Sequence, residues 1–275
     1  MFTEKRIKPD GRQLWLYSNM PMQASTDAPS PFAEPLNANP HLRWHPLRGK
    51  WVTYTSYRQN RTFLPPTEYN PLAVTINPDF PTELPQGDWQ IAVFDNHFPS
   101  LELTAHTPPE LIVSTKPAVG KCEVMVFTQD ANSSLGAQTL SYFELLFKVW
   151  AARTLELDQL ENIQYVLPFE NRGPEVGVTL NHPHGQIYAY PFVPPVPANM
   201  QFHAENYYKE NGRSVLEVMI AQVLDGRRIL YRGEHAVAFV PACARYPYEV
   251  WVAPIKAVAS FADLNDAQRS DFARA

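Results

Sequence analysis

The sequence predicts an α+β fold built from two related units, each an antiparallel sheet with helices packed on it. Three observations favour this fold. Many short apolar segments are typical of strands, only a few segments carry helical periodicity, and one pair of predicted strands recurs later in the chain. Proline is frequent, with 27 residues against 11 glycines, and this favours extended segments and rigid turns over long helices.

The beginning of the chain lacks the patterns of regular structure. Residues 17–40 are rich in proline, serine, alanine and asparagine, without periodicity. This composition is typical of loops. We therefore expect residues 1–40 to form an N-terminal arm or loop, and we place the start of the first folded unit at His41.

Residues 41–195 are predicted to form the first unit. Runs of β-branched and aromatic residues predict strands at 50–57, 89–96, 122–128, 163–170 and 185–192. Between the third and fourth of these, a helix is expected at about 136–156. Its apolar face would comprise residues with helical spacing, namely Leu140, Phe143, Phe147 and Trp150.

Residues 196–275 are predicted to begin a second, similar unit. Segment 236–254 repeats the pattern of 91–101 followed by 121–128, an apolar strand ending in Phe, a link and an E-V-x-V strand. A helix is expected near Ser214, which forms a capping-box pattern with Glu217, and another at Asn265, with Gln268 three residues on. Because this last pattern stops without a C-cap, we expect a longer protein.

Bulk properties exclude several classes of partner. The formal net charge of −5 argues against non-specific nucleic-acid binding, which needs a basic surface. Residues 1–12 lack the apolar core of a secretion signal, and no apolar run is long enough to span a membrane. Two cysteines, Cys122 and Cys243, are too few for a disulfide framework. We expect a cytoplasmic protein that binds neither nucleic acid nor membrane.

The stretch NHPHGQ, residues 181–186, carries the clearest functional signal. In an extended backbone His182 and His184 lie on the same side of the chain. A metal site would need further ligands, whereas a nucleophilic imidazole needs a partner that fixes its tautomer. The flanking polar side chains are suited to hold phosphoryl oxygens, which favours attack of an imidazole on phosphorus. These side chains are Asn171, Arg172, Thr179 and Gln186.

FENRGPEVGVTLNHPHGQIYAYPFVP, residues 169–194, closely resembles the galactose-1-phosphate uridylyltransferase family of the histidine-triad superfamily. The resemblance extends over most of the chain from His41. It includes WHPLRGKWV (44–52), SYRQNR (56–61), FDNHFPSLE (94–102), YPYEVWVAP (246–254) and LNDAQRSDF (264–272). The hydrolase branch of the superfamily has a third histidine at the position of Gln186, so the sequence resembles the transferase branch. The resemblance implies two histidine-triad-like units.

The resemblance also implies a reaction of galactose metabolism with two displacements. His184 would attack the α-phosphorus of UDP-glucose and release glucose 1-phosphate, and galactose 1-phosphate would then take the uridylyl group. The backbone carbonyl of His182 would accept the other ring N–H of His184. Gln186 would hydrogen-bond a phosphoryl oxygen, and its amide offers no acid–base group to activate water.

Six further positions match substrate contacts of the family. Asn171 and Thr179 match positions near the phosphates. Arg58 and Arg61 match two basic residues that face the diphosphate or sugar phosphate, and Asn96 and Phe98 match positions near the uridine. His97 lies where many relatives carry an acidic residue or an arginine.

The sequence departs from the family's pattern most clearly at the zinc site. Many relatives hold zinc with a Cys-x-x-Cys pair, a later histidine and the first histidine of the motif. Asn70 and Ala73 stand at the two cysteine positions, and Ala131 stands at the later histidine, so only His182 is left. We therefore expect no zinc and no other cofactor. The resemblance further implies a homodimer of the full-length protein.

Two alternatives stay open at the level of sequence. One is a related ADP-sugar phosphorylase or nucleotidyltransferase. The other is a catalytically silent nucleotide-binding relative, against which the retained Asn171, His184 and Gln186 count. The preferred sugar is not determined by the sequence.

Overall fold

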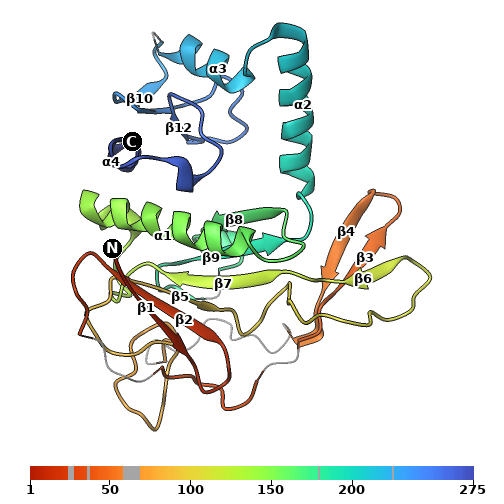
Figure 1. The fold of residues 1–275 in the computed structure, drawn as a ribbon, viewed down its shortest axis with the longest axis vertical. Coiled ribbons are helices and arrows are strands. Elements are labelled where there is room, and N and C mark those ends of the chain that lie inside the picture. The colour runs from red at the N-terminus through yellow and green to blue at the C-terminus, as the bar shows by residue number, and fades with distance from the viewer. Residues whose placement is uncertain (24–27, 36–37, 58–68, 179, 225) are drawn as a thin grey trace. The chain divides into compact units, whose positions relative to one another are not determined.

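A computed structural model describes residues 1–23, 28–35, 38–57, 69–178, 180–224 and 226–275 (Figure 1). The chain divides into two compact units, the first formed by residues 1–138 and 156–192 and the second by residues 139–155 and 193–275. The described chain combines α-helices with antiparallel sheets, so the predicted α+β class is confirmed. Among the described residues no helix has both the length and the apolar character needed to cross a bilayer.

A six-stranded antiparallel sheet forms the centre of the first unit. Its strand order is β1-β2-β5-β7-β9-β8. In that order, the strands are Phe2–Ile7, Gln13–Ser18, Ile91–Asp95, Lys121–Val126, His184–Tyr190 and Tyr165–Phe169. The strands β5, β7, β8 and β9 coincide with four of the predicted strands.

The prediction of an arm or loop is wrong for residues 2–18. These residues form strands β1 and β2, and β2 pairs with β5 from Leu14↔Phe94 to Tyr17↔Ile91. Leu14 and Leu16 are fully buried in the core of the unit. An Asp10-Gly11 turn joins the two strands, with Gly11 at φ +82°. Asp-Gly between apolar segments is a strong hairpin signal, and it went unused in the prediction.

A smaller three-stranded antiparallel sheet completes the first unit. Its order is β4-β3-β6, and the strands are Lys50–Tyr54, His41–His45 and Thr115–Pro117. The predicted strand at 50–57 is therefore confirmed at its beginning. The apolar cluster beneath includes Leu42, Leu101 and Ala118.

The described residues of the second unit form four α-helices and a three-stranded sheet. The helices are α1 (Leu140–Asp158, whose last three residues fall in the first unit), α2 (Pro195–Asn211), α3 (Val215–Val223) and α4 (Asp266–Arg274). The antiparallel sheet has the order β10-β11-β12, formed by Ile229–Arg232, Ala236–Phe239 and Trp251–Pro254. Helix α3 and strand β11 share one apolar cluster. The helix α2 was not predicted.

The predicted internal repeat corresponds to paired strands in both units. In the first unit β5 pairs with β7, and in the second β11 pairs with β12, each time antiparallel. That the two pairs derive from one repeated unit stays a prediction.

The helix signals were correct in position and partly wrong in detail. Asn265 and Gln268 form the complete capping box at the start of α4. Ser214 is the N-cap of α3, but its side chain makes no capping hydrogen bond, so that box is wrong. In α1 the predicted face holds buried Phe147, whereas Leu140 is 38% exposed. Most of the fully buried positions belong to a neighbouring face, namely Tyr142, Leu145, Leu146 and Val149.

Candidate active site

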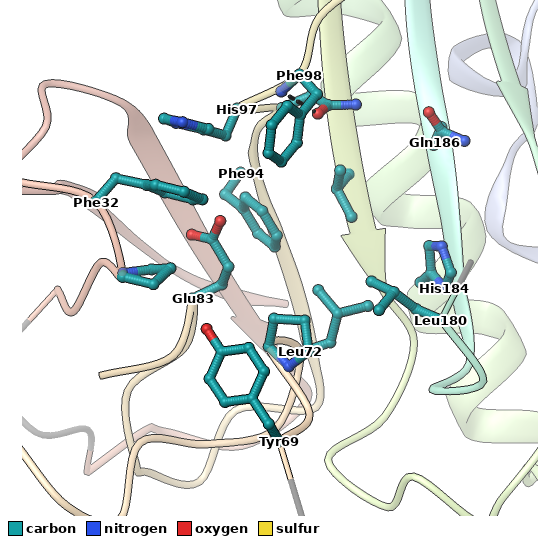
Figure 2. A pocket seen from close by; sticks show the side chains of 14 residues that line it. Phe32, Tyr69, Leu72, Glu83, Phe94, His97, Phe98, Leu180, His184 and Gln186 are labelled. Atoms are coloured by element: carbon teal, nitrogen blue, oxygen red, sulfur yellow. Dashed lines mark hydrogen bonds between the residues drawn. The ribbon is translucent and has the colours of Figure 1, made fainter. Parts of the chain in front are cut away.

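Strand β9 carries the two residues at the centre of the site. Side chains alternate along β9, so that Gly185, Ile187 and Ala189 are buried while His184 and Gln186 lie on the opposite, partly exposed face. Figure 2 shows both side chains at the edge of one pocket. The arrangement follows from the period of two in a strand, and it places an imidazole and an amide side by side.

Gly185 allows this strand to lie deep in the sheet. A Cβ atom at this position would lie 2.7 Å from the Cζ atom of Phe127 and 2.8 Å from the carbonyl oxygen of Phe169. Both distances are shorter than real Cβ contacts, and one neighbour is backbone. The glycine after the second histidine is therefore required by packing.

The ring of His184 is oriented by the backbone of its own motif. Its Nδ1 atom lies 2.7 Å from the carbonyl oxygen of His182. A carbonyl oxygen only accepts hydrogen bonds, so Nδ1 carries the proton and Nε2 carries the lone pair in the neutral ring. This is the protonation state that a nucleophilic imidazole requires.

The ring of His182 is held on both sides and is 3% exposed. Its Nε2 atom donates to the carbonyl oxygen of Thr128 over 2.6 Å, and its Nδ1 atom lies 2.8 Å from Nδ2 of Asn70. Burial lowers the pKa of His182, with an opposing contribution from the Thr128 carbonyl. His182 is therefore a neutral, structurally anchored ring.

The positions that match the family's zinc ligands do not fit a tetrahedral zinc site. Both ring nitrogens of His182 are engaged with protein groups, and Asn70 presents an amide NH₂, which has no lone pair for a metal. Over the described ranges of the chain, no three His, Cys, Asp or Glu side chains come together as ligands. That the protein holds no zinc stays a prediction.

The first pocket beside His184 is mainly apolar and aromatic. Tyr69, Leu72, Val124 and Leu180 form part of its wall, and Figure 2 shows a cluster of rings on the other side. This cluster is made by Phe32, Phe94, His97 and Phe98. Such a wall suits the flat, partly apolar surface of a nucleobase.

The structure brings Asn96 and Phe98 into this pocket together with His184 and Gln186. The side-chain oxygen of Asn96 accepts the backbone N–H of Phe98 over 2.8 Å, and this turn sets the position of the ring. Of the other predicted substrate contacts, Asn171 does not line this pocket but lines a second one. Arg58, Arg61 and Thr179 lie outside the described residues.

A second, polar pocket is also lined by His184. Its lining includes Asn171, Arg172, Ser133, His182 and His184. Glu170 also lines it, and burial raises the pKa of that carboxyl, with Arg172 opposing the shift. Amide, hydroxyl and guanidinium groups are donors for phosphate oxygens, so His184 lines both an aromatic pocket and a pocket suited to phosphate.

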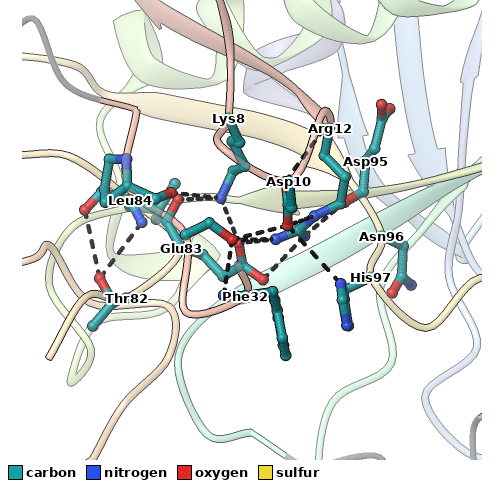
Figure 3. Close-up of polar contacts among 12 residues, drawn as sticks. Lys8, Asp10, Arg12, Phe32, Thr82, Glu83, Leu84, Asp95, Asn96 and His97 are labelled. Atoms are coloured by element: carbon teal, nitrogen blue, oxygen red, sulfur yellow. Dashed lines mark hydrogen bonds and ion pairs between the residues drawn. The ribbon is translucent and has the colours of Figure 1, made fainter. Parts of the chain in front are cut away.

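A buried ionic cluster supports the aromatic wall (Figure 3). Arg12 binds the Glu83 carboxylate with both Nη atoms, over 3.1 and 2.8 Å, and its Nε donates to Asp10 over 2.7 Å. Lys8, whose side chain is fully buried, also bonds to Glu83. Two positive and two negative charges thus balance in the interior, as buried charges require.

His97 packs between this cluster and the pocket. Its ring stacks on Phe32 at 3.3 Å between centroids, and its Nε2 lies 3.1 Å from the hydroxyl of Tyr57. Burial, with the nearby Arg12 charge, lowers the pKa of His97 to about 4. Sequence reasoning missed Phe32 and Glu83 as pocket residues, because the fold brings them there from distant segments.

Comparison with known proteins agrees with this geometry. Residues 32–194 match the family model described as galactose-1-phosphate uridyl transferase, N-terminal domain. The galactose-1-phosphate uridylyltransferase of Thermotoga maritima is 33% identical over 239 residues, which cover 85% of this chain and 72% of that protein. The chain belongs to the galactose-1-phosphate uridylyltransferase family. It is therefore a nucleotidyltransferase by family.

This chain is also similar to other proteins. The Streptomyces lividans galactose-1-phosphate uridylyltransferase is 35% identical, and the match covers 84% of this chain and 61% of that protein. An ADP-glucose phosphorylase of Arabidopsis thaliana is 23% identical, over 86% of this chain and 71% of that protein. A solved uridylyltransferase structure aligns with a TM-score of 0.73 at 23% identity, over 85% of this chain and 72% of that one, which confirms the fold.

Proposed function

We propose that this protein transfers the uridylyl group of UDP-glucose to galactose 1-phosphate through a covalent intermediate on His184. The proposal is supported above all by one contact, the 2.7 Å hydrogen bond from Nδ1 of His184 to the carbonyl oxygen of His182. This bond leaves the lone pair on Nε2, the atom that must form the bond to phosphorus.

The first displacement would break the bond between the α-phosphorus and the bridging oxygen of UDP-glucose. Nε2 of His184 forms the new bond to phosphorus, and glucose 1-phosphate leaves with the bridging oxygen. In the second displacement a phosphate oxygen of galactose 1-phosphate attacks the same phosphorus, and His184 leaves. The carbonyl of His182 stabilises the positive charge that the imidazole gains at the first attack.

The two pockets would divide the substrate between them. We assign the uridine to the aromatic pocket with Asn96 and Phe98, and the phosphates to the region of Gln186 and Asn171. Gln186 can donate to a phosphoryl oxygen as charge builds up on it, and a carboxamide does not activate water. This arrangement favours transfer to a sugar phosphate over hydrolysis.

The test is an exchange reaction without acceptor. Labelled glucose 1-phosphate and unlabelled UDP-glucose should give labelled UDP-glucose, because the first displacement is reversible on its own. Initial rates with both substrates should give parallel double-reciprocal lines, as a ping-pong mechanism requires. Intersecting lines together with no exchange would contradict the covalent route.

The ADP-sugar phosphorylase alternative is supported by one named relative, the Arabidopsis ADP-glucose phosphorylase. The same preparation should be assayed with ADP-glucose and inorganic phosphate. Faster turnover there than in uridylyl transfer would favour this alternative, and no turnover in either assay would favour the silent relative. We further propose that the protein is cytoplasmic and forms a homodimer, and light scattering tests the dimer.

A further inference from the structure

We propose that Asn70 is a positioning residue for His184 and acts through His182. Its side-chain amide would take the place of a metal link, by holding the imidazole of His182 and thereby the carbonyl that orients His184. This inference rests on the proposed function only in assigning His184 as the nucleophile. The positioning itself can be observed without turnover.

The orientation of the Asn70 amide is fixed by its own loop. The Oδ1 atom accepts the backbone N–H of Leu72 over 3.0 Å, and an N–H can only donate. The Nδ2 atom must therefore face the other way, where it lies 2.8 Å from Nδ1 of His182. Asn70 is thus the donor in this contact.

The tautomer of His182 follows from the same reasoning. Its Nδ1 accepts from Asn70, so the proton of the neutral ring is on Nε2, which donates to the carbonyl of Thr128 over 2.6 Å. The backbone also ties this segment to the motif, since the N–H of Phe127 donates to the carbonyl of Pro183 over 3.1 Å. The His182 ring therefore joins three chain segments: the loop at Asn70, the segment that follows β7 and the HPH motif.

This junction determines where the nucleophile stands. The carbonyl of His182 belongs to the residue whose ring is clamped, and that carbonyl receives the Nδ1–H of His184 over 2.7 Å. Tyr69 and Leu72, on either side of Asn70, line the aromatic pocket. Asn70 thus connects the pocket wall to the nucleophile through one residue, His182. One hydrogen bond reaches the ring of His182, and the other leaves from its carbonyl oxygen to His184.

The substitution Asn70→Ser separates the two roles of the asparagine. A serine hydroxyl can still accept the N–H two residues on and so keep the turn, but its side chain is too short to reach His182. The matched control is Asn77→Ser. Asn77 makes the same turn, with its Oδ1 accepting the N–H of Asp79 over 3.0 Å in an exposed loop.

Kinetics provides the first readout. At metal sites, loss of the group that orients a ligating histidine typically costs about 10–100-fold in metal affinity or activity, and we take the same range for a group that orients a nucleophilic histidine. We expect N70S to lower kcat by about that factor while KM for UDP-glucose changes by less than about threefold. N77S should match the wild type. If N70S keeps kcat within about twofold of N77S, Asn70 serves only its own turn and the proposal is wrong.

A double-mutant cycle tests whether the effect passes through His182. His182→Ala removes the ring, so Asn70→Ser, which keeps the turn, should have little further effect on kcat in that background. Independent, multiplying losses would contradict the proposed route.

Imidazole NMR of protein labelled with ¹⁵N-histidine provides a readout without turnover. The Nδ1–H resonance of His184 should be protected from exchange in the wild type and in N77S, and broadened or lost in N70S. An unchanged resonance in N70S overturns the proposal. If N70S loses this resonance and the wild type itself has no transferase activity, the positioning role is supported and the proposed function is refuted.

Discussion

The environment of each imidazole at the site is set by single atoms. His184 donates from Nδ1 to a backbone carbonyl, whereas the buried His182 donates from Nε2 to another carbonyl. The two rings of one short motif are thus held in opposite tautomers. Only the tautomer of His184 places the lone pair on Nε2, which is the outer nitrogen of the ring.

Replacement of His184 should remove the chemistry and leave the fold. We expect His184→Asn to lower kcat by several powers of ten, because an asparagine side chain has no nucleophilic nitrogen to form the intermediate. The melting temperature should change little, because the side chain is only partly buried. Steady-state assays and thermal melts measure both. More than about a hundredth of the wild-type activity would contradict the nucleophilic role.

His97 should make the protein less stable in mild acid. The pKa of this ring is about 4 when folded, against about 6.5 when unfolded. Between these values the unfolded chain binds more protons, so the free energy of unfolding falls as pH decreases from 6.5 to 4, by roughly 3 kcal/mol at most. The charged groups around the ring are Lys8, Asp10, Arg12 and Glu83.

Urea denaturation between pH 4 and pH 7 measures this contribution. His97→Gln does not titrate in this range, so its stability should depend less steeply on pH than that of the wild type. Equal slopes for the two proteins would show that other groups cause the acid sensitivity.

At the scale of elements, β9 is confined between β7 and β8. Gly185→Ala would force a methyl group against the ring of Phe127 and the carbonyl of Phe169. We expect a loss of about 1–3 kcal/mol in the free energy of unfolding, with a fall in kcat because His184 moves with the strand. Gly136→Ala is the control, since its nearest atom to the added Cβ is 4.0 Å away.

Chemical denaturation and activity of the two glycine variants are compared directly. If Gly185→Ala is as stable and active as Gly136→Ala, the strand can accommodate a methyl group at this position and the proposed packing requirement is wrong.

The sequence predicted the elements with strong local signals. Periodicity gave the strands β5, β7, β8 and β9 and the helix α1, and residue types gave the capping box of α4. It failed for β1 and β2 because the proline-rich segment after them was extended backwards to the start of the chain. The helix α2 was missed since it has no buried residues and hence no apolar stripe.

The site was predictable only where it is local in sequence. The motif 181–186 could be found from residue types, whereas Asn96 and Phe98 were indicated by the resemblance to the family. The Glu83 carboxylate and the Phe32 ring could not, because their place depends on how loops cross over the sheet. The same holds for Asn70, whose role depends on a contact 112 residues away.

At the scale of the whole molecule, both pockets lie within the first unit. The protein carries a formal charge of −5, while the proposed substrates are also anionic. Attraction must therefore come from local donors such as Arg172 and the amides of the second pocket rather than from the overall field.

The same unit is predicted to hold together without zinc. Elemental analysis of protein purified without a histidine tag should find no stoichiometric zinc, and a chelator should leave the melting temperature unchanged. The reason is that one hydrogen bond from Asn70 and another to the carbonyl of Thr128 engage the one histidine that remains of the family's ligand set. Stoichiometric zinc, or a marked fall in melting temperature on chelation, would show that the ligands lie elsewhere.

The most direct measurement is the mass of the protein after brief incubation with UDP-glucose alone. We predict one added uridylyl group per chain, located by peptide sequencing on His184, labile in acid and discharged by galactose 1-phosphate as UDP-galactose. The His184→Asn variant should gain no mass. A wild-type protein that turns over UDP-glucose without ever carrying the group, or that carries it on another residue, would contradict the account.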